Sequence, residues 1–208
     1  MEIKPLFTIN FFAFKCEKSL LEDTTKKIEL LNWRPGMKNE VSGDLHRSKD
    51  FAELHAWFQS CVNEVKHNLN LPFNELPIIQ SWSNRSFKGM WHHGHVHELS
   101  FLSGIFYLNS SSSGKTWFST ENPWFNFPLI YFKHRDSNIL IHKEVPEAGK
   151  LVLFPSHIYH SADDWEDNIP RYSVAFNTFP QGSFGQADEK CTLNIKIDTD
   201  SNNYEELF

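Results

Sequence analysis

The sequence has little cysteine, no long apolar run and no basic cluster, and each absence excludes a class of protein. Its 208 residues include only three cysteines, Cys16, Cys61 and Cys191, which are far apart and form no Cys-x-x-Cys pair. Such cysteines fit free thiols in a reducing compartment and exclude a zinc site built from cysteine. No stretch approaches the roughly 20 apolar residues that a membrane span requires. We therefore expect a soluble, cytoplasmic protein.

The charge and the aromatic content indicate what the protein binds. The net charge is −6, which argues against a nucleic acid or an anionic membrane as partner. Aromatic residues make up 15% of the chain, including 19 Phe and 7 Trp, so the core should be well filled and some aromatic side chains remain to line a pocket. We expect a single domain over residues 1–208 that acts on a small molecule or a protein.

The apolar pattern divides the chain into a helical part and a β-rich part. Residues 19–33 and 47–69 have helical spacing, and Ser48 or Asp50 can cap the second helix. Short β-prone runs separated by turn residues follow, at 77–82, 99–109, 115–119, 138–145, 149–155 and 171–179. This order predicts an α+β protein with an N-terminal strand and helices over 1–75, a β-sandwich or jelly roll over 76–180, and a C-terminal extension over 181–208 that frays at 198–208.

Four of the eleven histidines lie within residues 92–97. Because alternate residues of a strand face the same side, His95 and His97 would present their imidazoles together. His93 would join them if the strand began early, but Gly94 disfavours an early start since glycine weakens a strand. We take His95 and His97 as the pair.

A metal site needs a third ligand, and the segment 149–160 offers one. It combines an apolar strand with His157 and His160 at its exit. Two ligands from one strand and one from a distant strand would form a facial site with open positions opposite, and we select His160 as the third. Isolated histidines are more often structural than ligating, and we assign that role to His46, His55, His67, His134 and His142.

The run 171–177 adds an arginine to this arrangement. Alternation places Arg171, Ser173 and Asn177 on one face of a strand. If that face looks into the sandwich, the guanidinium lies at the mouth of a metal-bearing interior, where its fork suits a carboxylate. The alternative is an edge-strand arginine in solvent or paired with an acidic residue of 163–167.

These segments resemble the Fe(II)- and 2-oxoglutarate-dependent oxygenases, whose pattern is His-x-Asp/Glu, a distal His and then an Arg or Lys with a nearby Ser. More narrowly, "HVHELSFLSGIFYLN", "GKLVLFPSHIYH" and "RYSVAFN" resemble a branch common in marine bacteria and phages, in which His-x-His precedes "SG" and a Tyr-containing strand. The resemblance spans residues 78–179. It implies a double-stranded β-helix (jelly-roll) core with N-terminal helices packed on one sheet, and for a phage protein it implies the host cytoplasm.

The resemblance also implies a role for each matching residue. His95, His97 and His160 would hold Fe(II), while Arg171 and Ser173 would bind the distal carboxylate of 2-oxoglutarate. The implied enzyme is a dioxygenase that consumes O2, converts 2-oxoglutarate to succinate and CO2, and hydroxylates a substrate C–H bond.

Several further residues would surround such a site. Tyr107 would donate its hydroxyl to 2-oxoglutarate, or else be an ordinary core tyrosine. Two asparagines would position substrate or water, or cap backbone groups, and three tryptophans would form the pocket wall, or belong to the core or rim. They are Asn84 and Asn177, with Trp82, Trp91 and Trp117.

The chain departs from the superfamily at the middle ligand, where His97 replaces a carboxylate. Three neutral imidazoles leave the metal at a charge of +2, which dianionic 2-oxoglutarate would neutralise. Glu98 is out of phase with the histidine pair and would ligate only through a bulge or turn.

Two other classes of protein explain part of the pattern. A three-histidine zinc hydrolase or lyase would use the same ligands to acidify water, but it leaves Arg171 and Ser173 without a role. A non-catalytic jelly-roll binding module would leave the clustering of histidines unexplained.

Overall fold

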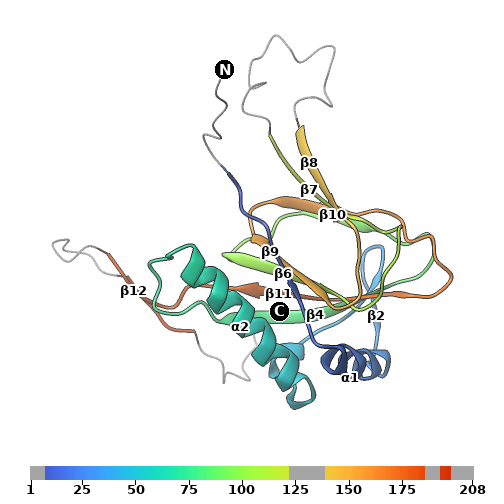
Figure 1. Ribbon diagram of the computed structural model, residues 1–208, viewed down its shortest axis with the longest axis horizontal. Helices are drawn as coiled ribbons and strands as arrows, with labels where there is room; N and C mark the ends of the chain where they lie inside the picture. Colours follow the sequence, from blue (N-terminus) through green and yellow to red (C-terminus); the bar gives the residue numbers. More distant parts are fainter. Residues whose placement is uncertain (1–7, 122–138, 186–192, 198–208) are drawn as a thin grey trace, which may run out of the picture.

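Two antiparallel β-sheets face each other beyond the N-terminal helices and form the centre of the fold (Figure 1). The protein is represented by a computed structural model, which describes residues 8–121, 139–185 and 193–197. The expectations for Cys191, for His134 and for the tail at 198–208 lie outside these residues.

Within the described residues, the larger sheet has the strand order β1-β9-β6-β11-β4-β3-β2, and the smaller sheet has the order β5-β10-β7-β8. The larger sheet consists of β1 (Phe12–Lys15), β2 (Arg34–Pro35), β3 (Glu40–Ser42), β4 (Ile78–Ser86), β6 (Leu102–Tyr107), β9 (Lys150–Pro155) and β11 (Arg171–Thr178). The smaller sheet consists of β5 (His92–His95), β7 (Thr116–Glu121), β8 (Ile139–Glu144) and β10 (Tyr159–Ala162). A separate pair joins β12 (Gly182–Phe184) to β13 (Leu193–Ile195). This arrangement confirms the predicted jelly-roll core.

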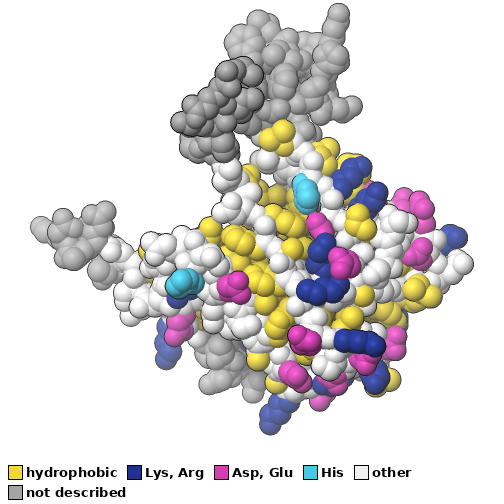
Figure 2. All heavy atoms as spheres, viewed as in Figure 1, with side chains coloured by type: hydrophobic (Ala, Val, Ile, Leu, Met, Phe, Trp, Pro, Cys, Tyr) yellow, Lys and Arg dark blue, Asp and Glu magenta, His cyan; other side chains and the backbone are white. Residues whose placement is uncertain are grey.

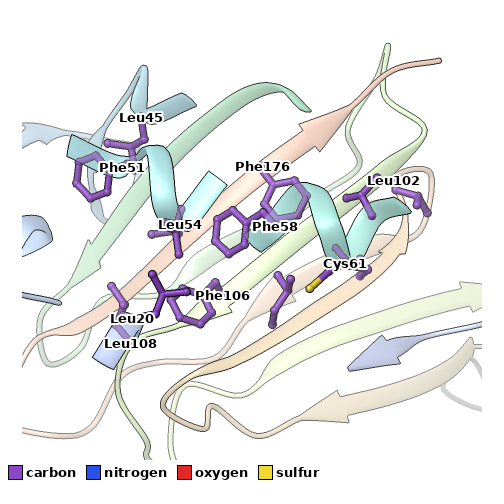
Figure 3. Packing of buried hydrophobic residues seen from close by; sticks show 14 of the residues in the cluster. Leu20, Leu45, Phe51, Leu54, Phe58, Cys61, Leu102, Phe106, Leu108 and Phe176 are labelled. Carbon is purple, nitrogen blue, oxygen red and sulfur yellow. The ribbon is translucent and has the colours of Figure 1, made fainter. Parts of the chain in front are cut away.

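The helices α1 (Lys18–Glu29) and α2 (Ala52–Asn68) cover one face of the larger sheet (Figure 1). Phe58 of α2 is fully buried, and its ring stacks on Phe176 of β11 with centroids 4.7 Å apart (Figure 3). Gly104 of β6 leaves room for the same ring, because a Cβ there would lie 2.4 Å from Phe176. The predicted packing of the N-terminal helices on one sheet is confirmed.

The start of α2 differs from the prediction. Neither Ser48 nor Asp50 caps the helix, because two 3-10 turns, Leu45–Arg47 and Lys49–Phe51, precede it and leave Phe51 at the N-cap without a side-chain hydrogen bond. The backbone supplies the turn instead, since the Phe51 amide donates to the Ser48 carbonyl at 3.1 Å. The chain therefore enters α2 through tightened backbone turns rather than through a polar cap.

Strand β11 separates two environments by simple alternation. Val174 and Phe176 belong to the core beneath the helices, whereas Arg171, Ser173 and Ala175 line a cavity on the opposite side of the sheet. The predicted division of this strand is confirmed. One strand thus connects the main hydrophobic core to the polar interior between the sheets.

The outer surface carries charges of both signs. On the face shown in Figure 2, Lys and Arg side chains are interspersed with Asp and Glu, and apolar side chains occupy the area between them. Among the described residues, no helix combines the length and apolarity needed to cross a lipid bilayer. The expectation that nucleic acid is not a partner stays a prediction.

Replacing Phe58 by Ala should destabilise the fold by about 3–5 kcal/mol, because the substitution opens a cavity beneath β11. The free energy of unfolding from urea denaturation measures this effect. The matched control is Glu64→Ala on the exposed side of α2, which should change stability by less than about 0.5 kcal/mol. Equal stabilities for the two variants would contradict the assignment of Phe58 to the core.

Candidate metal and anion site

The structure brings the three predicted ligands together on the inner side of the smaller sheet. One ring nitrogen from each of His95, His97 and His160 lies within 4.8 Å of the others. His95 ends β5 and pairs with His160 on the neighbouring strand β10. His97 follows β5, and its backbone amide donates to the Ser156 carbonyl at 3.0 Å. Two neighbouring histidines and a third that is distant in the sequence therefore meet at one point.

Backbone carbonyls orient two of the three rings. Nδ1 of His95 lies 2.9 Å from the His93 carbonyl, and Nδ1 of His160 lies 3.0 Å from the Ile158 carbonyl. Since a carbonyl oxygen can only accept, each Nδ1 carries the ring proton and each Nε2 keeps a lone pair. This arrangement is typical of histidines that bind a metal through Nε2.

Burial keeps the three imidazoles neutral. Desolvation lowers the pKa of His160 to about 3 and that of His97 to about 4, and it also lowers the pKa of His95. Repulsion from the neighbouring histidines acts in the same direction. Because a metal binds the neutral form, the imidazoles can act as ligands at neutral pH, and the donor set fits a divalent transition metal.

Strand β5 contains a bulge that the sequence analysis missed. The strand begins at His92, so the expectation that Gly94 would prevent an early start is wrong. His95 pairs with His160, and His92 pairs with Ala162. Between these two pairs β5 moves by three residues and β10 by only two. The extra residue turns His92 towards the cavity, where its ring centroid lies 4.8 Å from that of His95.

Gly94 is the sequence feature that marks this bulge. A Cβ at this position would lie 1.9 Å from the Tyr159 hydroxyl oxygen, so only glycine allows Tyr159 to lie across β5. An isolated glycine within a strand pattern is a signal of a bulge or of a close approach. This signal could have identified His92 as a fourth histidine of the cavity wall.

Arg171 lies in the same cavity, at the start of β11. Its side chain is buried, with 8% of the residue exposed, and burial lowers the pKa of its guanidinium. Nη2 donates to Thr116 Oγ1 at 3.3 Å, while Nε has no hydrogen-bond partner in the described part of the chain. No ion pair joins Arg171 to a described acidic residue, so the alternative pairing within 163–167 is not what the structure shows. The site therefore presents a buried positive charge that needs an anion.

Thr116 is a second residue that the sequence analysis missed. Its Oγ1 accepts from Arg171 Nη2 and from the Tyr107 hydroxyl, the latter at 2.8 Å. With both lone pairs occupied, the Thr116 hydroxyl proton is free to be donated, and the residue lines the cavity. Tyr107 is fully buried behind it, so the structure directs the tyrosine hydroxyl to Thr116 rather than into the cavity.

Three further predicted residues line the cavity. Ser173 and Asn84 are register partners and both line the cavity, as does Trp82, whose ring centroid lies 5.6 Å from that of His97. Asn39, which the sequence analysis missed, donates to the Asn84 side-chain oxygen at 2.9 Å. The cavity wall thus combines one tryptophan with an asparagine pair.

Trp91 and Trp117 do not line this cavity, which favours the alternative that they belong to the core or the rim. Trp117 faces outwards because its neighbours in β7, Thr116 and Phe118, face inwards, and its Nε1 donates to Asp163 at 2.6 Å. Trp91 precedes β5 and borders a neighbouring hollow, which shares His92, Ser161 and Ala162 with the cavity. Glu98 is exposed in the turn after His97 and does not belong to the ligand group.

Comparison with known proteins identifies relatives of this site. Residues 80–177 match a family described as "Putative 2OG-Fe(II) oxygenase", and no curated protein matches the sequence. The matched range begins in β4 and ends in β11, so it contains the three histidines and Arg171. The narrower resemblance to a branch with His-x-His stays a prediction.

Solved structures share the fold at low sequence identity. HygX from Streptomyces hygroscopicus, solved with nickel, 2-oxoglutarate and hygromycin B, is 17% identical with a TM-score of 0.64, covering 83% of this chain and 84% of its own. A prolyl-4-hydroxylase from Pseudomonas putida is 14% identical with a TM-score of 0.59, covering 84% and 95%. The α-ketoglutarate-dependent epimerase SnoN from nogalamycin biosynthesis is 10% identical with a TM-score of 0.66, covering 85% and 80%.

Replacing Thr116 by Val should destabilise the protein by about 1–3 kcal/mol, because it leaves two buried donors without their acceptor. Thr116→Ser keeps the hydroxyl and should retain most of the stability. Thermal and urea unfolding of the two variants measure the difference. If valine is tolerated as well as serine, Thr116 does not connect Tyr107 to Arg171.

Proposed function

We propose, from the match of residues 80–177 to the 2OG-Fe(II) oxygenase family, that the protein is a 2-oxoglutarate-dependent dioxygenase that hydroxylates a substrate C–H bond. The observation that carries the proposal is the pairing of three neutral histidines with a buried arginine in one cavity. Neither a zinc hydrolase nor a binding module requires that arginine.

The histidines are the proposed iron ligands. His95, His97 and His160 would hold Fe(II), and the carbonyl contacts that fix the His95 and His160 rings support this assignment. When bound, Fe(II) supplies the activation of O2 that couples the oxidative decarboxylation of 2-oxoglutarate to oxidation of the substrate. The three residues contribute no negative charge, so the metal would keep its full charge of +2 until an anion binds.

Arg171 is the proposed partner of the distal carboxylate of 2-oxoglutarate. Its unpaired Nε and the free Thr116 proton are both donors, and a carboxylate would satisfy them together. Ser173, on the same face of β11, would complete the contact. The dianion would then place one carboxylate at the metal and the other at the guanidinium, which accounts for a cavity wall without an acidic residue in the described chain.

The surrounding side chains would keep water out and position the substrate. Phe154 and Phe118 lie beside His160, with ring centroids 4.9 Å and 6.0 Å away, and their apolar surface strengthens electrostatic contacts at the site. Asn84, fixed by Asn39, would offer its amide to the substrate beside Trp82. We propose a small molecule or a protein as this substrate and place the reaction in the cytoplasm.

Replacing His160 by Ala should abolish tight binding of Fe(II), whereas Arg171→Ala should leave metal binding intact and weaken 2-oxoglutarate. Loss of one partner of a buried charge pair costs about 2–5 kcal/mol, which corresponds to roughly a 30-fold to several-thousand-fold rise in the dissociation constant. Anaerobic calorimetry with Fe(II) and then 2-oxoglutarate separates the two steps. The control is the exposed arginine variant Arg34→Ala, which should bind both as the parent protein does.

Turnover provides a separate test of the reaction type. In the presence of Fe(II) and O2, the protein should convert 2-oxoglutarate to succinate and CO2, and with substrate present the product should contain oxygen from 18O2. Product without 18O would favour an epimerase-type outcome over hydroxylation. Tight binding of zinc, with hydrolysis or elimination and no succinate, would overturn the proposal in favour of a hydrolase or lyase.

A further inference from the structure

His97 is held differently from the other two histidines. Its Nδ1 faces the side-chain amide of Asn177 at 3.4 Å, where His95 and His160 face backbone carbonyls. An amide nitrogen can only donate, so this arrangement makes Nδ1 an acceptor and places the ring proton of His97 on Nε2. In that tautomer Nε2 has no lone pair for a metal.

Asn177 is the first member of a buried network of side-chain hydrogen bonds. Its Oδ1 accepts from Ser103 Oγ at 2.8 Å, Ser103 Oγ lies 2.8 Å from Ser156 Oγ, and Ser156 Oγ lies 2.8 Å from Ser100 Oγ. Ser100 reaches the Thr178 carbonyl at 3.2 Å. Asn177, Ser103 and Ser156 are all buried, so the network is shielded from bulk water between His97 and Ser100.

Reversal of this network loses no hydrogen bond and gains one. While Ser103 donates to Asn177, the single proton of Ser100 is directed to Ser156 and none reaches the Thr178 carbonyl. Each serine hydroxyl donates once and also accepts, so a rotation of the Asn177 amide by about 180° lets its nitrogen donate to Ser103, Ser103 to Ser156, and Ser156 to Ser100. Ser100 then donates to the carbonyl at the end. After this reversal Asn177 Oδ1 faces His97, accepts the proton on Nδ1 and leaves Nε2 with its lone pair.

The other contact of the amide permits the rotation. Asn177 Nδ2 also donates to Gln80 Oε1 at 3.3 Å, and Gln80 is exposed, so its own amide can turn and donate to Oδ1. The backbone of His97 stays fixed meanwhile, because its amide donates to the Ser156 carbonyl. The change is therefore confined to the side chains behind the ring.

We propose that Asn177, backed by Ser103, Ser156 and Ser100, is a positioning residue that selects the ligating tautomer of His97. This inference rests on the proposed metal site. A carboxylate at the same place would need no such device, because it binds a metal through either oxygen and carries no ring proton. The buried network supplies the acceptor at Nδ1 that a histidine in this position requires in order to bind a metal through Nε2.

The test compares the tautomer of His97 with the affinity for Zn(II), used alone as a redox-inert probe. In the parent protein with Zn(II) bound, 15N chemical shifts of the imidazoles should show the ring proton of His97 on Nδ1. Asn177→Leu removes the acceptor and should raise the Zn(II) dissociation constant about 10–100-fold. Asn177→Asp can only accept, so its apoprotein should already hold the Nδ1–H form and should bind Zn(II) at least as tightly as the parent.

Ser81→Ala is the matched control, because Ser81 is a buried serine of the neighbouring strand whose hydroxyl has no partner in the described chain. It should leave both the tautomer and the Zn(II) affinity unchanged.

If Asn177→Leu does not fold, the tautomer of His97 in Asn177→Asp and in Ser103→Ala provides the test. Failure of the parent protein to bind Zn(II) would refute the metal site itself. Tight binding with an unchanged tautomer in all Asn177 variants would refute only the role of Asn177.

Discussion

The site depends on one electrostatic constraint, which is that a buried arginine and three neutral histidines share a cavity whose described wall contains no acidic residue. A buried guanidinium without a counter-ion is costly, and its Nε has no hydrogen-bond partner among the described residues. A divalent cation on the histidines would add to the positive charge. A bound dianion that spans both ends would offset two of these three positive charges, so metal and cosubstrate are expected to bind in a coupled way.

The fold supplies this arrangement through the two faces of β11. Phe176 anchors one face against Phe58 of α2, while Arg171 at the start of the strand projects between the sheets. The smaller sheet contributes His160 from β10 opposite it. The helices contribute no described residue to the cavity wall, and their effect on the site is to fix the position of the strand that carries the arginine.

Alternation and motif spacing were sufficient to predict the fold class and the convergence of the histidines with Arg171. They could not predict His92, because a one-residue bulge inverts the parity of β5, and only Gly94 signals it. The role of Thr116 could not be predicted from the sequence, because its hydroxyl accepts hydrogen bonds from Tyr107 and Arg171, which lie on other strands.

The most direct test of the account is an anaerobic titration of the apoprotein with Fe(II) and then 2-oxoglutarate, followed in the visible spectrum. The account predicts a charge-transfer band from the chelated keto acid in the parent protein, and a markedly weaker band in Arg171→Ala at the same 2-oxoglutarate concentration. A protein that binds zinc tightly but gives no band with Fe(II) and 2-oxoglutarate would contradict it, as would a band that is indifferent to the loss of Arg171.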